Sequence, residues 1–396
     1  MSNKIALFND SFPPTIDGVA NTIYNYADIL TKKQLADCTV VTPKYPNVND
    51  NYDFDVVRYS SASVSKNLEY RVGNIVPIKT LTTLLNKDFD LVHVHSPFVS
   101  AVVADELVKL NPNIPVVFTY HTKFDIELEK RFKDKLFLKV AKKFILNNIN
   151  RADEVWVVSK GSIESLKSFG YKGPYRVMRN GTDFKSGVSS EERIKKLKEK
   201  HQINDDELVF LFVGRMMWYK NIKLIIDALR LLPADLKFKM IFVGKGNDVK
   251  DIENYTKHIG ISKKCVFAGA VYDREILRDY YSASDLFLFP STYDTSGLVV
   301  MEAAATALPS VLIKNSCASE GVINNRNGFL CDENEKSLKD VILNAVSNRD
   351  KLKEIGINAQ KEVYYSWEDS ITNAYKRYIE IIDEFKPRDI FGKRKG

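Results

Sequence analysis

Residues 289–303 read FPSTYDTSGLVVMEA, and this stretch predicts a strand, a loop and a helix in succession. The apolar run at its start is short and is bounded by Pro290, which is typical of a buried strand. The segment 298–308 is rich in Ala, Val, Met and Leu and predicts a buried helix, with Ser296-Gly297 where its N-cap would lie. A helix that begins after a parallel strand presents its first amides to an anion.

The residues around the start of this helix predict a binding site for a phosphate group that is linked to sugars. We expect the free amides near Gly297, Leu298 and Val299 to bind the anion. Asp294 precedes the helix and Glu302 lies in its second turn. Acids beside a phosphate are unfavourable unless they accept hydrogen bonds from hydroxyls, so the pattern indicates a nucleotide sugar. The alternative is a capping Asp and a solvated helix Glu, because acids are common in first helical turns.

The pattern PSxxDxxGLxxxEA, which begins at Pro290, resembles the signature of the GT4 family of retaining glycosyltransferases. These enzymes have the GT-B fold. The resemblance implies that Asp294 touches the donor hexose and that Glu302 binds the ribose hydroxyls. It also implies that amides around the glycine, Ser296 included, hold the diphosphate. The chain departs from the family at the first acid, which is usually Glu.

Composition and length bound the class of protein. With 396 residues, 44% of them hydrophobic and 28% charged, we expect two or three globular domains. No apolar run approaches the roughly 20 residues of a membrane span, and the N-terminus lacks the form of a signal peptide. The four cysteines are scattered and form no CxxC pair. We therefore expect a cytoplasmic protein in a reducing compartment, with no metal site.

Residues 131–151 carry seven Lys or Arg and one acid, Asp134, with apolar residues between them at helical spacing. A basic amphipathic helix of this kind can lie on an anionic membrane surface, which would make the protein peripheral on the inner face of the membrane. The alternative is a domain helix with its Lys face in water and its apolar face on the sheet. An isoelectric point near 8.9 is also compatible with nucleic-acid binding. No matching motif is present, however, so we expect no nucleic-acid partner.

The first strand is predicted at residues 4–8 and the first helix at residues 19–30. The connection between them should lie at the carboxyl edge of the sheet, where open α/β sheets bind ligands. Gly18 would let the backbone approach a diphosphate, or it serves only the geometry of a turn. The connection resembles a GT4 loop that usually reads Gly-Gly, with Asp17 in place of one glycine.

Two histidines follow strand-like runs: His95 after residues 91–94 and His121 after residues 116–120. A histidine at a strand end is more often a loop or core residue than a catalytic one. The resemblance to the GT4 family implies that His121 faces the donor sugar across the cleft and that His95 lines the acceptor side. We also place Thr122 and Asn180 on the acceptor side.

The second half begins a new series of strands at residues 208–214. Arg215 follows this strand at once, and Lys220 stands just before a helix. A guanidinium and an ammonium between a strand end and a helix start suit a phosphate, although such residues are often surface charges. The pattern VGRxxxxK, which includes Gly214, resembles the GT4 pattern whose Arg and Lys hold the donor phosphates.

Two further strands end in glycine turns, at Gly244 and at Gly269. The region from Gly269 to Tyr272 resembles the base-binding loop of the family, and we expect Gly244 and Tyr272 to contact the donor. No Gly-x-Gly-x-x-Gly fingerprint follows a first strand. Asp-x-Asp triplets at residues 53–55 and 88–90 precede strand-like runs and are better explained as turn acids than as metal ligands.

The alternation of strands and helices predicts an α/β protein with two Rossmann-like domains that face each other across a cleft, the GT-B arrangement. We place the first domain at residues 1–188, with a helix at 370–396 packing back on it, and the second at residues 189–369. The predicted partners are a nucleotide sugar, expected to be a UDP-sugar, and a hydroxyl acceptor, with no cofactor and no metal.

The predicted catalytic residues are His121, Asp294, Arg215 and Lys220. The two cations and the helix amides would stabilise charge on the departing diphosphate. The chain resembles diacylglycerol glucosyltransferases, which implies a membrane glycolipid acceptor; a polysaccharide, repeat unit or protein is the alternative. A non-catalytic sugar-nucleotide-binding subunit is a hypothesis of another class, motivated by Asp294 and Asp17. Intact phosphate cations argue against it.

Overall fold

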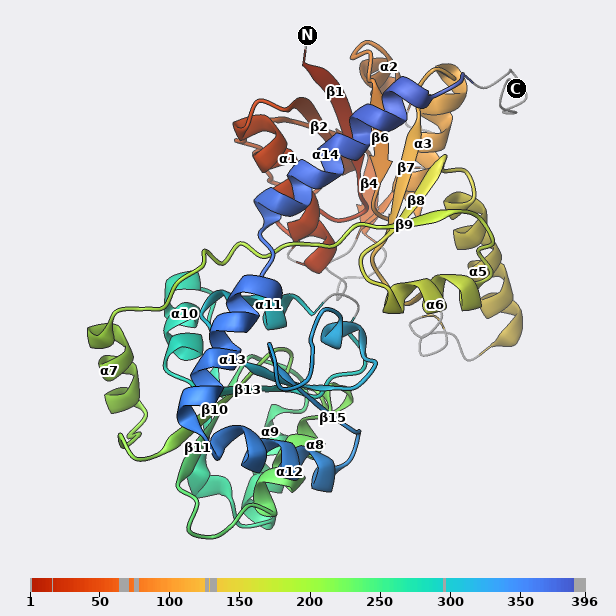
Figure 1. Cartoon of the computed structure of the whole chain (residues 1–396). Helices are drawn as coiled ribbons and strands as arrows, with labels where there is room; N and C mark the ends of the chain where they lie inside the picture. The colour runs from red at the N-terminus through yellow and green to blue at the C-terminus, as the bar shows by residue number, and fades with distance from the viewer. Residues whose placement is uncertain are drawn as a thin grey trace. The chain divides into compact units, whose positions relative to one another are not determined.

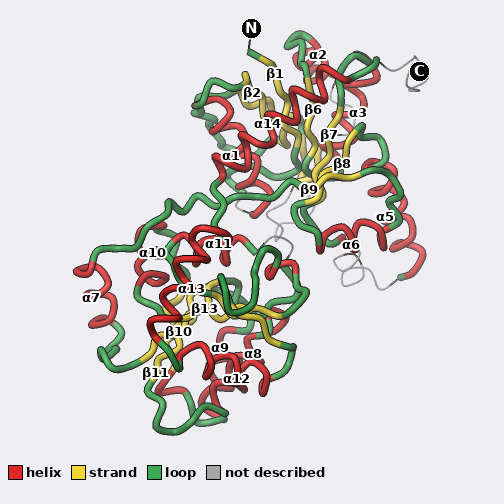
Figure 2. The backbone as a smooth tube through the Cα atoms, viewed as in Figure 1, coloured by secondary structure: helices red, strands yellow, loops and turns green. Residues whose placement is uncertain are grey.

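The computed structural model describes residues 2–15, 17–63, 71–74, 78–124, 128, 134–294 and 297–387. The chain divides into two compact units (Figure 1). Unit 1 comprises Met1–Asn180 and Trp367–Gly396, and unit 2 comprises Gly181–Ser366. In each unit the strands lie together and helices surround them (Figure 2), which is the α/β class predicted from the sequence.

Unit 1 is built on a parallel sheet with the strand order β3-β2-β1-β6-β7-β8-β9. Its strands are β1 (Asn3–Phe8), β2 (Ala36–Pro43), β3 (Asp55–Tyr59), β6 (Leu91–Val94), β7 (Val116–Tyr120), β8 (Glu154–Val157) and β9 (Tyr175–Val177). A separate antiparallel pair is formed by β4 (Ser61–Ser63) and β5 (Arg71–Gly73). The helices are α1 (Gly18–Lys32), α2 (Ile78–Leu85), α3 (Val99–Leu110), α5 (Lys135–Ile149), α6 (Gly161–Phe169) and α14 (Trp367–Glu384).

The core of unit 1 lies on both faces of this sheet because side chains alternate along each strand. Ile5 and Leu7 of β1 belong to one buried cluster with residues of α1 and α14, whereas Ala6 and Phe8 belong to the cluster on the other face. Helix α14 contributes Trp367 and other apolar residues at intervals of three and four, and it lies beside α1. The returning helix thus begins at Trp367, three residues before the predicted position, and residues 388–396 of the predicted 370–396 helix lie outside the described part.

Unit 2 has a second parallel sheet, with the order β12-β11-β10-β13-β14-β15. Its strands are β10 (Leu208–Val213), β11 (Phe238–Val243), β12 (Cys265–Gly269), β13 (Leu286–Phe289), β14 (Ser310–Ile313) and β15 (Phe329–Cys331). The helices are α7 (Glu191–Lys200), α8 (Ile222–Arg230), α9 (Val249–His258), α10 (Arg274–Ser282), α11 (Leu298–Ala305), α12 (Glu335–Val346) and α13 (Arg349–Glu362). Short 3-10 turns are η1 (Trp218–Lys220), η2 (Ser262–Lys264) and η3 (Cys317–Ser319).

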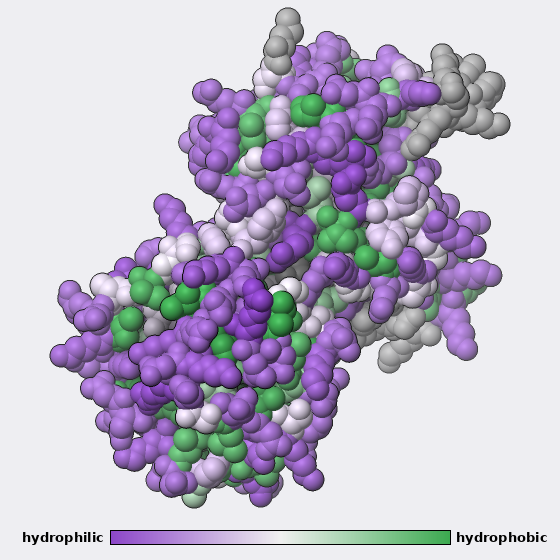
Figure 3. Space-filling model, viewed as in Figure 1, coloured by the Kyte–Doolittle hydropathy of each residue, from purple (hydrophilic) through white to green (hydrophobic). Residues whose placement is uncertain are grey.

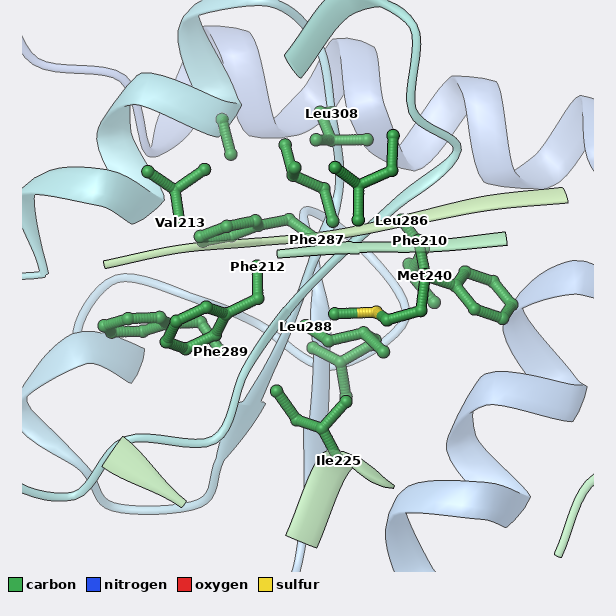
Figure 4. Packing of buried hydrophobic residues seen from close by; sticks show 14 of the residues in the cluster. Phe210, Phe212, Val213, Ile225, Met240, Leu286, Phe287, Leu288, Phe289 and Leu308 are labelled. Atoms are coloured by element: carbon green, nitrogen blue, oxygen red, sulfur yellow. The ribbon is translucent and has the colours of Figure 1, made fainter. Parts of the chain in front are cut away.

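The central strands of unit 2 carry its apolar core (Figure 4). Every residue of β10 and β13 is buried, as expected for strands covered on both faces. The rings of Phe287 and Phe289 lie 5.7 Å apart with an angle of 10° between their planes, and Phe212 lies 5.9 Å from Phe289. This packing fixes the carboxyl ends of β10 and β13, where the candidate site begins.

The residues just before position 189 belong to unit 2, which differs from the predicted limit at residue 188. The amide of Thr182 donates to the carbonyl oxygen of Tyr365 at 2.9 Å, and that of Gly187 donates to Ala305 at 2.8 Å. These backbone bonds tie the segment to unit 2, so the limit lies after residue 180. The chain returns to unit 1 between residues 366 and 367, instead of between residues 369 and 370 as predicted.

The molecular surface in Figure 3 is largely hydrophilic, with apolar side chains in small groups. Within the described residues, no helix combines the length and the apolar composition that crossing a bilayer requires.

Candidate functional site

The loops after β10 and β13 are neighbours at one edge of the sheet of unit 2. The two strands pair in parallel, with Phe210 opposite Leu286, so both chains leave the sheet at the same side. Immediately after β10, Gly214 lies close to β13, and a Cβ atom there would stand 3.8 Å from the ring of Phe289. The loop with the two cations predicted to bind phosphate and the loop predicted to bind the hexose therefore begin next to each other.

Lys220 and Asp294 bind each other directly. The Nζ atom of Lys220 lies 2.7 Å from Oδ1 of Asp294, and the two side chains are only 10% and 26% exposed. The rings of Tyr219 and Tyr293 lie near the same ammonium, with centroids 5.5 and 5.6 Å from Nζ. Lys220 is thus held by one carboxylate and by two aromatic faces that attract a cation. Lys220 and Asp294 were both expected at the donor, but their mutual contact and the two tyrosines were not predicted from the sequence.

Asn221 joins the same two loops. It adopts a left-handed backbone conformation, with φ at 58°, which asparagine tolerates better than most residues. Its Nδ2 atom donates to the carbonyl oxygen of Pro290 at 2.9 Å and to Oε1 of Glu333 at 2.6 Å. The positions of the cationic loop and the acidic loop are therefore coupled.

Arg215 differs from Lys220 in having a free guanidinium. Its side chain is exposed and makes no hydrogen bond or ion pair with any residue that the structure describes. A guanidinium is well suited to a phosphate because its donors are arranged in a planar fork. The geometry leaves Arg215 available for such a ligand, and its binding to the donor stays a prediction.

Helix α11 begins as the sequence predicts, with Gly297 at its N-cap. This residue has φ at 56°, and a Cβ atom on it would lie 3.0 Å from Cα of Ala318, so both conformation and space require glycine. The amides of Leu298 and Val299 have no side-chain cap and no backbone acceptor within the described residues. They are the first amides of the helix and could receive an anion. Ser296 lies outside the described residues.

Glu302 is buried, so the alternative of a solvated helix Glu is wrong. Its Oε1 accepts from Arg274 at 2.8 Å and its Oε2 accepts from Tyr281 at 2.8 Å. Arg274 also pairs with Asp183. Burial raises the pKa of the Glu302 carboxyl, although Arg274 and Tyr281 act in the opposite direction. Each carboxylate oxygen has a second lone pair for a ligand hydroxyl, so ribose binding stays a prediction.

The other part of that alternative, a capping role for Asp294, is also wrong. Among the described residues no side chain caps α11, and Oδ1 of Asp294 accepts from Lys220. Its Oδ2 atom is buried without a hydrogen-bond partner among the described residues. A buried unpaired carboxylate oxygen is costly and can be satisfied by a ligand hydroxyl.

Gly244 has a structural explanation that needs no ligand. A Cβ atom at this position would lie 1.8 Å from the carbonyl oxygen of Gly214, so the two loops could not approach as they do. Its amide donates to Gly269 at 2.8 Å, which links the ends of β11 and β12. The predicted donor contact of Gly244 remains a prediction, but its identity as glycine follows from packing.

Tyr272 is one of the most exposed aromatic residues, at 73% of its full accessible surface. The Nζ atom of Lys245 lies 5.6 Å from its ring centroid. An exposed ring after β12 offers a face for stacking, which is compatible with the predicted contact to the base.

In unit 1, Asp17 occupies the start of α1. Its Oδ1 accepts from the amides of Val19 and Ala20 at 2.9 and 2.8 Å, which is an N-cap. A diphosphate that met these amides would have to displace the carboxylate. Asp17, which stands where the family usually has a glycine, therefore supplies an anion from within the chain. The predicted diphosphate contact of Gly18 stays a prediction.

The histidines of unit 1 form a row that includes one member missed by the sequence analysis. His93 lies on β6, and His95 follows two positions later, just after the strand ends; their ring centroids are 3.8 Å apart, so the two side chains lie on the same side. His93 is fully buried and contacts the hydroxyls of Tyr378 and Thr119 at 2.5 and 2.6 Å. The alternation His-x-His in a strand was the available signal.

His95 and His121 are hydrogen-bonded to each other, with Nδ1 of the first 2.9 Å from Nε2 of the second. Both rings are buried, His95 at 3% and His121 at 9% exposure, and the predicted place of His95 on the acceptor side stays a prediction. Burial lowers the pKa of His121 to about 3 and that of His95 well below its usual range. Thr122 is partly exposed and Asn180 is buried.

The fold of this chain is that of GT-B glycosyltransferases. Sucrose-phosphate synthase from Thermosynechococcus elongatus superposes with a TM-score of 0.76 at 19% identity, covering 97% of this chain and all of that one. The Anabaena protein HepE in complex with UDP and glucose gives a TM-score of 0.72 at 20% identity, with the same coverage. The predicted two parallel-sheet α/β domains are thus confirmed.

Family comparisons agree with the fold. Residues 16–186 match the family model described as Glycosyltransferase Family 4, and residues 193–362 match the one described as Glycosyl transferases group 1. The chain belongs to the group 1 glycosyltransferases of the GT4 type, which confirms the resemblance seen in the sequence.

Two curated relatives carry the same name. The alpha-monoglucosyldiacylglycerol synthase of Streptococcus pneumoniae is 25% identical over 313 residues, which are 78% of this chain and 70% of that protein. The enzyme of this name from Acholeplasma laidlawii is 24% identical over 400 residues, covering 96% and 98%.

Proposed function

We propose that this chain is a retaining hexosyltransferase that moves a hexosyl group from a UDP-sugar to a hydroxyl of a membrane lipid such as diacylglycerol, which yields a glycolipid. The observation that carries the donor half is the cationic edge of unit 2, where Arg215, unpaired among the described residues, and the largely buried Lys220 follow β10, the neighbour of β13. The names of the two relatives and the UDP found with HepE support the choice of substrates.

The diphosphate is held by the side chains of Arg215 and Lys220 and by the amides of Leu298 and Val299. On binding, the phosphate takes the place of Asp294 beside the ammonium of Lys220. Asp294 then accepts hydrogen bonds from the hexose, Glu302 accepts from the ribose, and Tyr272 stacks on the base. These donors stabilise the charge that develops on the leaving diphosphate, which is the usual main source of rate enhancement.

In the reaction, the bond between the anomeric carbon and the diphosphate oxygen breaks, and the acceptor oxygen bonds to the same carbon from the same face. The acceptor proton passes to the departing phosphate oxygen, which acts as the base. The leaving group needs no divalent ion because the two cations and the helix amides supply positive charge. His121 of unit 1 binds an oxygen of the sugar nucleotide.

The acceptor half rests on helix α5 (Figure 1), which buries one face against unit 1 and leaves a second apolar face open. Its residues with exposed apolar side chains are Leu136, Phe137, Val140 and Phe144, at 71, 67, 59 and 44%. Leu136, Val140 and Phe144 are spaced four apart and so form one stripe. A helix that buried all of its apolar residues on the sheet would not show this stripe.

Lysines lie beside the stripe, at positions 135, 139, 142 and 143. Apolar side chains that enter the acyl boundary, flanked by lysines that meet anionic headgroups, are typical of a helix lying on a membrane surface. Residues 131–133 of the predicted basic segment lie outside the described part. We assign α5 as the surface that brings the chain to its lipid acceptor.

The experiment is a transfer assay with radiolabelled UDP-glucose, UDP-galactose and GDP-mannose, with diacylglycerol in vesicles containing anionic lipid. We expect a labelled glycolipid with an α linkage, formed equally in the presence of EDTA. Lys220→Ala and Glu302→Gln should both abolish most of the transfer. Undiminished turnover in both variants would overturn the donor assignment, and transfer only to soluble saccharides would overturn the lipid acceptor.

A further inference from the structure

His95 and His121 meet nitrogen to nitrogen at the ends of adjacent strands. The strands β6 and β7 pair in parallel, with Val94 opposite Phe118, and each histidine follows shortly after its strand. The N···N distance is 2.9 Å, the ring planes differ by 12° and the ring centres are 5.1 Å apart. Two nearly coplanar imidazoles joined by one N–H···N hydrogen bond have this geometry.

Neighbouring aromatic rings fix the position of His95. The ring of His93 lies 3.8 Å from that of His95, and the edge of Tyr26 contacts both. His93 is itself held by Tyr378 and Thr119. His95 therefore has little freedom to rotate, and its hydrogen bond to His121 has a defined direction in space.

Only one of the two facing nitrogens can carry the hydrogen, because a hydrogen bond needs one donor and one acceptor. Burial lowers the pKa of both imidazoles, so each ring carries a single hydrogen in all. In the first arrangement Nδ1 of His95 donates, Nε2 of His121 accepts, and His121 carries its own hydrogen on Nδ1. In the second arrangement the donor is His121, so its Nδ1 is a bare lone pair. The choice decides what His121 presents to a ligand.

The surroundings of His95 favour the first arrangement. Its Nε2 atom is buried and has no hydrogen-bond partner among the described residues. In the second arrangement this nitrogen would carry a buried hydrogen without an acceptor, and orphaned buried N–H groups are rarer than orphaned acceptors. In the first arrangement it is only an unsatisfied lone pair.

We propose that His95 is a positioning residue that donates Nδ1–H to Nε2 of His121 and so fixes His121 as the Nδ1–H tautomer, a hydrogen-bond donor to an oxygen of the bound sugar nucleotide. Nδ1 of His121 has no partner within the residues that the structure describes. The inference rests on the proposed function for the identity of the ligand, whereas the tautomer itself belongs to the free protein.

The consequence for binding is that His121 always offers a hydrogen and never a lone pair. Sugar hydroxyls and phosphate oxygens both accept hydrogen bonds, so a fixed donor suits either. Without His95 the ring of His121 could turn or change its tautomer. We expect the loss to fall on kcat/KM for the donor, by about ten- to a hundredfold, below the loss for removing a donor altogether.

The test is nitrogen NMR of the unliganded protein labelled with ¹⁵N-histidine. We expect the His121 signals to report a protonated Nδ1 and a bare Nε2. His95→Ala should shift them toward the Nε2–H form, and His95→Asn, whose amide can donate from nearly the same place, should retain the Nδ1–H form and most of the activity. His258→Asn, on an exposed helix end of unit 2, is the matched control and should change neither.

A His121 that is protonated on Nε2 in the unsubstituted protein would overturn the proposal, and this measurement needs no variant to fold. An unchanged His121 signal in a folded His95→Ala variant would overturn it as well. Titration with UDP and with UDP-glucose separates the two acceptor oxygens, because a Nδ1–H shift with UDP alone identifies a phosphate. A protein with the expected tautomer but no sugar transfer would refute the proposed function and leave the tautomer assignment standing.

Discussion

The ammonium of Lys220 and the carboxylate of Asp294 lie 2.7 Å apart, so two residues assigned to the same substrate satisfy each other when it is absent. Such a pair keeps a largely buried cation in place at the edge of unit 2. In the proposed function the diphosphate replaces Asp294 beside the ammonium. Asp294 can then turn to the hexose, which links phosphate binding to sugar recognition.

Lys220→Ala should destabilise unit 2 by about 2 kcal/mol, because it leaves a largely buried carboxylate without its cation. The matched control is Lys223→Ala. Lys223 pairs with Asp227 one turn apart on α8, but its side chain is 58% exposed, so its loss should cost about 0.5 kcal/mol or less. Urea unfolding measures both. Equal effects of the two substitutions would contradict the buried pair.

Arg215→Ala should leave stability unchanged within about 0.5 kcal/mol, since the exposed guanidinium makes no hydrogen bond or ion pair with a described residue, while donor affinity falls by about ten- to a hundredfold. Arg274→Ala is the informative comparison. Arg274 binds Glu302 and lies over the ring of Phe184 at 4.2 Å, so its removal should cost about 2 kcal/mol. Isothermal titration with UDP and urea unfolding separate the two outcomes. An Arg215→Ala variant that binds UDP normally would exclude the phosphate role.

The elements themselves could be predicted because their signals are local. The run that forms β10 is apolar at every position, and Pro290 and Gly297 mark where β13 stops and α11 starts. The contact between Lys220 and Asp294 could not be predicted in this way. It depends on β10 lying next to β13, and the strand order of a sheet is not contained in the periodicity of either strand.

The same reason explains the residues that were missed. Arg274 reaches Glu302 only because α10 and α11 are brought together by the sheet, and nothing near Arg274 in the sequence marks it. His93 was not singled out, because a histidine inside a strand-like run carries no signal that separates it from an ordinary buried residue. The domain limit shifted because backbone hydrogen bonds, which leave no trace in composition, attach residues 181–188 to unit 2.

Gly297→Ala should destabilise unit 2 by about 2–3 kcal/mol. The left-handed backbone at φ 56° costs an alanine about 1 kcal/mol, and the new methyl group would press on Ala318. Gly260→Ala isolates the first of these effects, because Gly260 has φ at 81° and nothing within 4 Å of its Cβ position. Thermal unfolding should place the Gly260→Ala variant about 1 kcal/mol below the unsubstituted protein. If the Gly297→Ala variant is as stable as the Gly260→Ala variant, α11 can start without the close contact to Ala318.

Val140→Asp should weaken binding to anionic vesicles at least about tenfold, because it places a charge in the exposed stripe of α5 and removes about 1.5 kcal/mol of apolar burial. Ile357→Asp on α13 is the control, since Ile357 is also an exposed apolar residue, at 47%, but lies on unit 2. Flotation at low and high salt measures binding, which should fall as salt screens the lysines. Equal flotation of both variants would remove α5 from the membrane assignment.

Acidification should unfold unit 1 through its row of buried histidines. Burial holds the pKa of His93 and His95 well below the usual range and that of His121 at about 3. The unfolded chain binds protons at these residues below about pH 6.5, whereas the folded unit does not, so stability is complete above that pH and is lost as the pH falls. Each imidazole contributes a loss of about 2 kcal/mol at pH 5.

The measurement can be made specific to unit 1 by replacing Trp218 with Phe. The other two tryptophans, Trp156 and Trp367, are both buried in unit 1, so fluorescence then follows this unit alone. Urea unfolding at pH 7, 6 and 5 should show a steep loss of stability. His95→Asn removes one of the titrating groups and should reduce that loss by about 2 kcal/mol at pH 5, whereas His258→Asn in unit 2 should not. A pH dependence that is the same in both variants would mean that His95 is protonated in the folded protein and that its burial does not keep it neutral.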